Sequence, residues 1–204
     1  MTADNKQTRS EIKRASIINA AREEFLRCGF REANMDVIAE KAAVSKRTVY
    51  NHFPSKEDLF GAIALQLLAE FRRATQIEFD PTRPAREQLL EFAEREVDLL
   101  TSDTYVRVFR LFLVESHSSP ELVERILPPG TFEDNPLRGW LQDAAKAGVL
   151  AVPDAVIASV ELHGMLKGAL FWPAIIGYAK PMTRKERQAV IDSAVDTFLS
   201  RYNA

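Results

Sequence analysis

The chain has 204 residues, and its 27 Lys and Arg against 29 Asp and Glu give a net charge of −2 at pH 7. Apolar residues make up 46% and charged residues 27%, which is typical of a globular protein and excludes the collagen-like and disordered classes. The single cysteine excludes a disulfide framework and any zinc site that needs two thiolates. Taken over the whole chain, the near-zero charge also argues against nucleic-acid binding.

The sequence shows no export or membrane segment. Its first twenty residues are polar and charged, without the apolar core of a secretory signal. The longest uncharged apolar stretch, 168–179, is twelve residues long and contains Pro173, so it is too short to span a bilayer. We therefore expect a cytoplasmic protein.

Three helices are predicted in the N-terminal region from the helical spacing of apolar residues and from capping residues. Gly29 can end the first helix, and Asn34 and Ser45 can cap the second and third. Val49 and Phe53, four residues apart, share the inner face of the third helix. The predicted helices cover about 8–28, 35–42 and 45–53.

The remainder of the chain also has helical periodicity. Ser55 with Asp58, and Thr183 with Glu186, have the spacing of capping pairs, and Asp154 can cap a long apolar helix kinked by its proline. No alternating pattern is long enough for a strand, so the sequence predicts an all-α protein of about nine helices. Beyond the third helix, the predicted helices cover about 55–79, 85–100, 103–115, a short segment after 120, 135–146, 154–178 and 183–202, with turns at 80–84 and 128–130.

Residues 35–53 have the pattern of a helix-turn-helix, with two short helices joined by a three-residue turn. A recognition helix must fit the major groove and turn its N-terminal residues toward base edges and phosphates. Val49 and Phe53 would anchor this helix inside the domain. From the residues alone, a merely solvated polar face stays an open alternative. The outward residues are Lys46, Arg47, Thr48, Tyr50, Asn51 and His52.

The segment 35–40 followed by 44–60 strongly resembles the TetR/AcrR family of bacterial transcriptional regulators. The resemblance is contiguous from about 12 to 60, and it joins the helix-turn-helix, the Tyr-x-His-Phe element and the Ser-Lys-Glu-Asp helix start in order. Ala43 stands where the family commonly has Gly, and we expect an unstrained backbone there. The sequence Ala-Leu-Phe-Trp-Pro at 169–173 is similar to the C-terminal domain of the AefR-like branch.

The resemblance implies a helix-turn-helix DNA-binding domain over 1–56 and a ligand-binding and dimerisation domain over 57–204. Tyr50 can alternatively pack its ring against the first helix, and Arg9, Lys13 and Arg14 are either backbone contacts or solvated charges. Carried over by position, the candidates for base edges are Arg47, Thr48 and Asn51. The candidates for phosphate are Tyr50, His52, Lys56 and Asn34, with Lys46 able to serve either role.

An enzyme, a metal site and a cofactor are not expected. The three histidines, His52, His117 and His163, form no zinc-protease or di-iron pattern, and the sequence contains no nucleophile elbow, phosphate-binding loop or dinucleotide fingerprint. Cys28 falls on the buried face of the first helix, where a structural thiol is expected rather than a nucleophile.

A small-molecule pocket would be lined by apolar and aromatic groups with a few polar anchors, which suggests an apolar or aromatic effector. Core packing is the competing explanation for each aromatic candidate, and a satisfied interior histidine is the competing explanation for His163. The candidate lining residues are Phe71, Phe109, Phe112, His117, Trp140, His163, Met165, Phe171 and Trp172.

Two features are candidates for a homodimer interface. Gly164 and Gly168 lie four residues apart and permit close approach, either within the chain or by a partner helix. A stripe on the last predicted helix can face its own core or a two-fold partner. The stripe consists of Ile191, Val195, Phe198 and Tyr202. In the family such helices commonly form a four-helix interface.

The charge is divided unevenly along the sequence. Residues 1–56 hold 11 basic and 7 acidic residues, a net charge of +4, and residues 57–204 have a net charge of −6. Between 41 and 56 there are four basic residues and no acidic one, so the whole-chain argument against nucleic acid does not hold. We expect a homodimeric repressor that a small molecule releases from a palindromic DNA operator. The alternatives are an activator, a regulator without an effector, and a ligand-binding module that has lost its DNA role.

Overall fold

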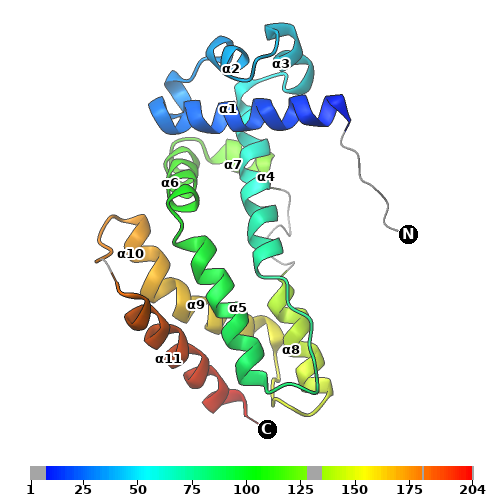
Figure 1. Ribbon diagram of the computed structural model, residues 1–204, viewed down its shortest axis with the longest axis vertical. Helices are drawn as coiled ribbons and strands as arrows, with labels where there is room; N and C mark the ends of the chain where they lie inside the picture. The colour runs from blue at the N-terminus through cyan, green and yellow to red at the C-terminus, as the bar shows by residue number, and fades with distance from the viewer. Residues whose placement is uncertain (1–7, 128–134, 181, 204) are drawn as a thin grey trace. The chain divides into compact units, whose positions relative to one another are not determined.

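The computed structural model describes residues 8–127, 135–180 and 182–203 (Figure 1). All regular secondary structure within these ranges is helical, apart from one isolated bridge between Leu150 and Asn203. The all-α prediction is confirmed, and the predicted turn at 128–130 lies outside the described residues. The helices are α1 (Arg9–Glu32), α2 (Met35–Lys41), α3 (Lys46–His52), α4 (Lys56–Ala74), α5 (Ala85–Leu100), α6 (Asp103–Ser118), α7 (Pro120–Ile126), α8 (Pro136–Lys146), α9 (Ala155–Leu166), the π-helix η1 (Lys167–Phe171), α10 (Trp172–Ile175) and α11 (Arg184–Tyr202).

The chain forms two compact units that do not coincide with the predicted domains. Unit 1 comprises Met1–Leu67 and Arg107–Pro129, and unit 2 comprises Leu68–Val106 and Gly130–Ala204. A boundary at residue 56 would separate the start of α4 from the core into which it packs, since Leu59 and Phe60 are buried in the same cluster as Val49. Apolar burial therefore extends unit 1 beyond the helix-turn-helix.

The core of unit 1 is built around aromatic rings from α1 and α4. Phe25 packs edge-on against Phe30 at 5.6 Å and against Phe60 at 6.0 Å between ring centroids. Phe60 in turn stacks on Phe112 of α6 at 6.2 Å. Close-packed aromatic pairs of this kind add to the gain from apolar burial. They fix the scaffold that carries α2 and α3.

The core of unit 2 lies among α5, α8, α9 and α11. Trp140 is 1% exposed, donates its indole N–H to Gln88 Oε1 at 3.0 Å and meets the Phe79 ring edge-on at 5.6 Å. Helix α4 ends at Ala74 and residues 76–80 are not helical, so the predicted helix to 79 is wrong over its last five residues. In this non-helical segment Ile77 and Phe79 both pack against the core of unit 2.

The predicted caps are present where the structure describes them. The side chains of Asn34, Ser45 and Asp154 accept hydrogen bonds from backbone N–H groups of α2, α3 and α9. Ser55 and Asp58 bond reciprocally at the start of α4. A full capping box begins α11 at Thr183.

The long apolar helix predicted over 154–178 is divided into α9, η1 and α10. Pro173 has no N–H to donate to the carbonyl four residues earlier. This explains why the backbone hydrogen bonds change from the α-type (i to i−4) to the π-type (i to i−5) pattern just before Pro173. The helix then ends at Ile175, because Gly177 adopts φ +75° and the chain turns back through a 2.8 Å bond from Tyr178 N to Pro173 O.

Among the described residues of unit 1, two positions have left-handed backbone. Gly29 has φ +81°, so it interrupts α1 as predicted, although helical residues continue to Glu32. Ala43, in the turn between α2 and α3, has φ +52°. The expectation of an unstrained backbone at Ala43 is therefore wrong, because the turn imposes the conformation that glycine would adopt without a Cβ penalty.

Candidate nucleic-acid interface

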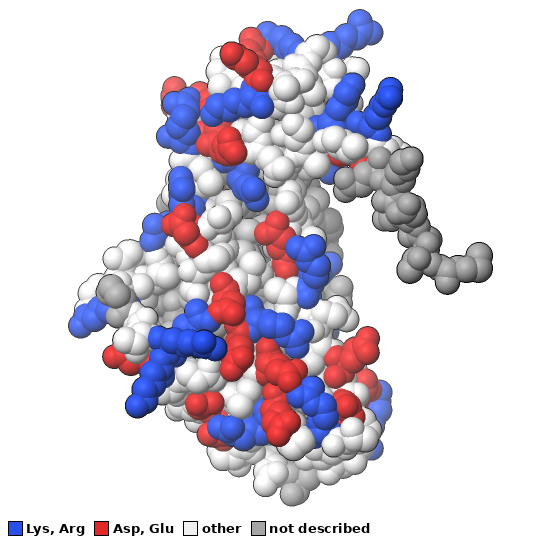
Figure 2. All heavy atoms as spheres, in the orientation of Figure 1, with Lys and Arg blue, Asp and Glu red and all other residues white. Residues whose placement is uncertain are grey.

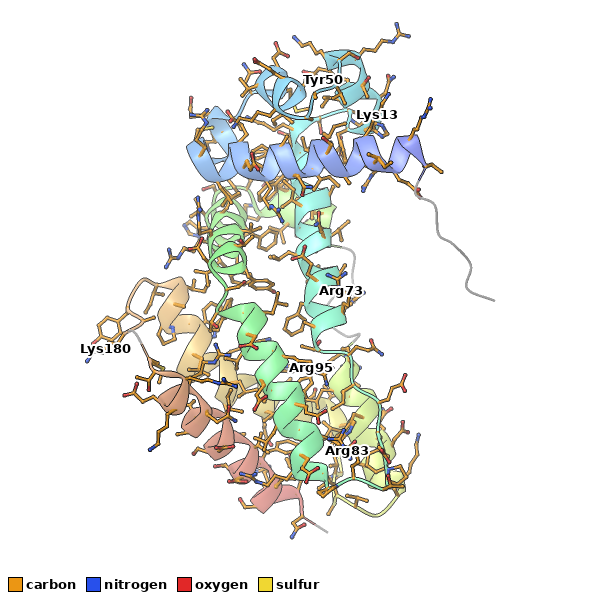
Figure 3. All side chains as sticks on the ribbon, viewed as in Figure 1. Lys13, Tyr50, Arg73, Arg83, Arg95 and Lys180 are labelled. Atoms are coloured by element: carbon orange, nitrogen blue, oxygen red, sulfur yellow. The ribbon has the colours of Figure 1, made fainter. Side chains whose placement is uncertain are left out.

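Helix α3 has one buried side and one exposed side. Val49 and Phe53 are 0% and 3% exposed and hold the helix against unit 1. Arg47, Tyr50 and Asn51 are exposed. Figure 3 shows Tyr50 among the side chains of α2 and α3, and the residue is 43% exposed.

The first turn of α3 is held by a local hydrogen-bond network. Ser45 Oγ accepts from Thr48 N at 3.1 Å and also lies 2.8 Å from the Thr48 hydroxyl. Thr48 and His52 are half-buried, and the His52 ring lies 6.4 Å from that of Phe53. Both side chains are therefore partly covered by their own domain, in contrast with Arg47.

The N-terminus of α2 borders the same surface. Asn34 Oδ1 caps α2 by accepting from Asp36 N at 2.8 Å. The Asp36 carboxylate in turn accepts from Lys46 Nζ at 2.7 Å, and this ion pair joins the first turns of α2 and α3. The pairing raises the pKa of Lys46, so Lys46 stays cationic.

Two other lysines of the predicted basic segment point into their own domain. Lys56 Nζ donates to the Arg31 carbonyl at 2.6 Å and the Ala33 carbonyl at 3.3 Å, which satisfies acceptors at the end of α1 and occupies two of its three donors. Lys41 Nζ donates to Glu24 at 2.8 Å. Lys56 thus has a structural function that the sequence did not indicate.

Glu24 is a buried carboxylate that the sequence analysis missed. It is 1% exposed and is held by Arg27 at 2.6 Å and Lys41 at 2.8 Å. Hydrogen bonds from Arg27 and then from Lys41 lower its pKa to about 2. Cys28 donates to the Glu24 carbonyl at 3.2 Å, and burial with the nearby Glu24 charge raises its pKa, which disfavours the nucleophilic thiolate.

Two of the six ligand candidates in unit 2, His163 and Phe71, belong to or adjoin a buried polar chain. Glu96 is 0% exposed and accepts from His163 Nδ1 at 2.7 Å, while His163 Nε2 lies 2.8 Å from Asn135 Nδ2. Lys167 Nζ is 3.7 Å from Glu96 and lies 4.9 Å from the centre of the Phe71 ring. His163 is therefore a satisfied interior histidine, as the competing explanation had it.

The other candidates differ in exposure. Trp140 and Phe171 are buried core residues, Met165 is half-buried and Trp172 is 45% exposed. A cleft of about 520 Å³ in unit 2 is lined by residues 76–79 and the first turns of α8, and Trp140 is the candidate that borders it. The remaining three candidates belong to unit 1. There the half-buried Phe112 packs against the core, the ring centroid of Phe109 lies 6.5 Å from that of Phe112, and His117 is exposed.

The proposed dimer stripe on α11 needs correction. Its four side chains are between 0% and 4% exposed and form part of the core of unit 2, so they are not available to a partner. The helical spacing of these apolar residues is explained by the packing of α11 against α5 and α9 within the same chain. The residues of this corrected set are Ile191, Val195, Phe198 and Tyr202.

Gly164 and Gly168 are in a different position. Both are exposed, and a Cβ built on either would meet no atom within 4 Å. Close packing within the described chain therefore does not explain these glycines. Exposed apolar side chains lie on either side of the two glycines in the chain: Val160, one turn earlier on α9, is 64% exposed, and Ile176, in the turn after α10, is 73% exposed.

The described residues contain no group of three or more His, Cys, Asp or Glu side chains placed to hold a metal ion. Within the same ranges, no helix combines the length and apolar character that crossing a membrane requires. What the geometry offers is an outward polar helix on a rigid three-helix scaffold. The fold and this surface define a helix-turn-helix protein of the DNA-binding class.

Comparisons with known proteins agree with this class. Residues 17–63 match the family described as bacterial regulatory proteins, tetR family, and residues 87–204 match the AefR-like transcriptional repressor, C-terminal domain. The chain belongs to the TetR family of transcriptional regulators and has an AefR-like C-terminal domain.

Individual relatives extend the comparison. The HTH-type transcriptional regulator UidR of Escherichia coli (strain K12) is 48% identical over 73 residues, which cover 34% of this chain and 37% of UidR. The match thus spans well under half of that relative. A TetR family transcriptional regulator from Pseudomonas syringae pv. tomato str. DC3000 has a TM-score of 0.75 and 34% identity over 99% of both chains. The Flavonoid-responsive Regulator FrrA has a TM-score of 0.74 and 27% identity over 94% of this chain and 97% of its own.

Proposed function

We propose that this protein is a homodimeric repressor that binds a palindromic operator and leaves it when a small-molecule effector binds. The observation that carries the proposal is the division of α3 into a buried side and an exposed polar side, which includes Arg47, Tyr50 and Asn51. Arg47 suits the guanine edge and Asn51 the adenine edge, since each can form paired hydrogen bonds there. The dimer leaves the operator when the effector stabilises a state of the dimer that cannot bind DNA.

The exposed face of α9, η1 and α10 is the dimer surface that we propose. Gly164 and Gly168 leave open space on an exposed face that also carries apolar side chains, and the absence of a Cβ at both positions would let a partner helix approach closely. A second copy that approaches Gly164 and Gly168 closely would cover Val160 and Ile176. A two-fold dimer would place two α3 helices about 34–36 Å apart, one turn of the duplex.

The effector that we propose for unit 2 is a planar aromatic molecule. Three facts support this: the cleft volume of about 520 Å³ lies in the range for small ligands, the cleft is bordered by the Trp140 and Phe79 side chains, and the relative FrrA is named as flavonoid-responsive. Quercetin is a suitable probe. It should lower operator affinity, whereas an aliphatic alcohol of similar volume should leave the complex intact.

We propose that helix α4 transmits effector binding to the DNA-binding helices, because its residues contribute to both units. A change in the tilt of α4 would alter the spacing of the two recognition helices. Promoter-coupled expression with and without quercetin distinguishes a repressor from an activator and from a regulator without an effector. A cytoplasmic location follows from action on chromosomal DNA.

Selection of bound duplexes from a random DNA pool tests the proposal directly. The expected product is an inverted repeat, and enrichment of no sequence would contradict an operator-binding function. Arg47→Ala should then weaken binding to the selected duplex about tenfold and relax the preference at one base position in each half-site. Arg31→Ala, which removes an exposed arginine at the end of α1, serves as the control and should bind like the wild type.

A further inference from the structure

The four basic residues between 41 and 56 are not equally free to meet DNA. Lys41 is bound to the buried Glu24, and Lys56 is bound to two backbone carbonyls. Lys46 is paired with Asp36, and Arg47 has no hydrogen-bond or ion-pair partner among the described residues. The charge available to phosphate is therefore smaller than the sequence count suggests.

The pair of Lys46 with Asp36 differs from that of Lys41 in its exposure. The side chains of Lys46 and Asp36 are 60% and 53% exposed, whereas Glu24 is 1% exposed. Because both groups of the Lys46 pair face solvent, a Lys46 ammonium released from Asp36 could reach a phosphate, whereas Lys41 is held against a buried carboxylate. Figure 2 shows acidic as well as basic side chains on the α2–α3 side of unit 1, so the candidate surface is not uniformly basic.

We infer that Asp36 is a positioning residue that raises sequence selectivity by holding Lys46 across the first turns of α2 and α3. This inference rests on the proposed DNA-binding function. Non-specific binding depends almost entirely on charge, so a lysine that is already paired contributes little to it. In the operator complex the pair stays formed and keeps Lys46 beside Arg47 and Thr48, where base contacts supply the affinity.

Asp36→Asn is the test, with affinity for the selected operator and for a scrambled duplex measured by fluorescence anisotropy between 50 and 300 mM KCl. The freed lysine should add one phosphate contact to the scrambled complex, which makes the slope of log affinity against log salt steeper by about 0.9. Affinity for the scrambled duplex should rise about fivefold at 100 mM salt while operator affinity changes less than twofold.

Glu40→Gln is the matched control, because Glu40 is an exposed acidic residue of the same helix whose carboxylate has no hydrogen-bond or ion-pair partner among the described residues. It makes the same change in charge and should leave the salt slope unaltered. Equal slopes for Asp36→Asn and Glu40→Gln would overturn the inference, since only net charge would then matter. An equal gain on both duplexes for Asp36→Asn would also overturn it.

A double-mutant cycle separates positioning from a structural effect on α2. In a Lys46→Met background, Asp36→Asn should have no further effect on selectivity or on the salt slope, because the cation that it releases is absent. A persistent effect in that background would assign the change to α2 itself and contradict the inference. If the wild type enriches no operator at all, the proposed function fails, whereas the scrambled-duplex slopes still test the Lys46 pair.

Discussion

At the scale of single residues, Ala43 carries the clearest sign of strain. Its φ of +52° is unfavourable for a residue with a Cβ, and the turn between α2 and α3 imposes it. Ala43→Gly should raise the free energy of unfolding by about 1 kcal/mol, as measured by urea denaturation. Ala189→Gly, at an exposed helical position of α11, should lower it by a similar amount. A loss at both positions would show that the turn is not strained.

Glu24 should make the stability of unit 1 depend on pH in the acid range. Its pKa is about 2 in the folded state against an ordinary value of 4.5, because Arg27 and Lys41 donate hydrogen bonds to the carboxylate. The stabilisation is therefore fully present above pH 4.5 and is lost as the pH falls toward 2.

Glu24→Gln measures that contribution. At pH 7 it should cost about 2 kcal/mol of unfolding free energy, and the difference from the wild type should shrink as the pH is lowered from 4.5. Glu23→Gln, at the exposed neighbouring position, should match the wild type throughout. A pH-independent difference for Glu24→Gln would assign the loss to packing rather than to charge.

At the scale of elements, the cap of α8 is linked to the interior of unit 2. Asn135 Oδ1 accepts from Leu137 N at 3.0 Å, which fixes the amide so that Nδ2 faces His163 Nε2. Nδ2 can only donate, so Nε2 is an acceptor and the imidazole proton sits on Nδ1, directed at Glu96. The prediction is a neutral His163 in the Nδ1–H tautomer, visible in imidazole ¹⁵N NMR.

Asn135→Ala should lower the unfolding free energy by about 2 kcal/mol, because it removes both the cap and the donor to a buried nitrogen. Asn34→Ala, which removes only a cap, should cost about 1 kcal/mol in the same denaturation assay. Equal losses at the two positions would show that the bond to His163 contributes nothing.

The sequence predicted helices well where periodicity and caps agreed, as for α2, α3 and α11. It failed where tertiary packing decided the backbone. Helix α4 ends earlier than predicted, and Ile77 and Phe79 after it pack against the core of unit 2. The residues just before Pro173 form the π-helix η1 instead of continuing the α-helix. Glu96 could have been noticed, since it lies four residues after Phe92 on the apolar face of its helix.

At the scale of the whole molecule, the sequence could not tell an internal apolar stripe from an external one. The α11 stripe has ideal helical spacing but is buried within its own chain, whereas the α9 face is exposed. Periodicity identifies a buried face, but which neighbour covers it depends on how the helices are arranged. The outward residues of α3 were easier to identify. Once Val49 and Phe53 are assigned to the buried side of this short helix, the polar residues between them must lie on the opposite, exposed side.

Replacing Gly164 and Gly168 with Leu should abolish the dimer. The new side chains have open space within the chain, so each protomer should stay folded while a partner helix is held apart. Light scattering should report a monomer, and operator affinity should fall at least tenfold because paired half-sites are lost. Gln142→Leu, at an exposed position of α8 outside the lining of the cleft, is the control. A double variant that stays dimeric would place the interface elsewhere.

The internal pairing of Lys41, Lys46 and Lys56 has a consequence for how the regulator is distributed in a cell. A chromosome offers millions of competing sites, and a strongly basic reader would be sequestered on them. A DNA-binding domain with few unpaired cations binds these non-specific sites more weakly, so a larger fraction of the protein stays free of the chromosome. For the proposed repressor, fewer copies would then suffice to occupy an operator, and binding of its effector would change operator occupancy without first depleting copies bound elsewhere on the chromosome.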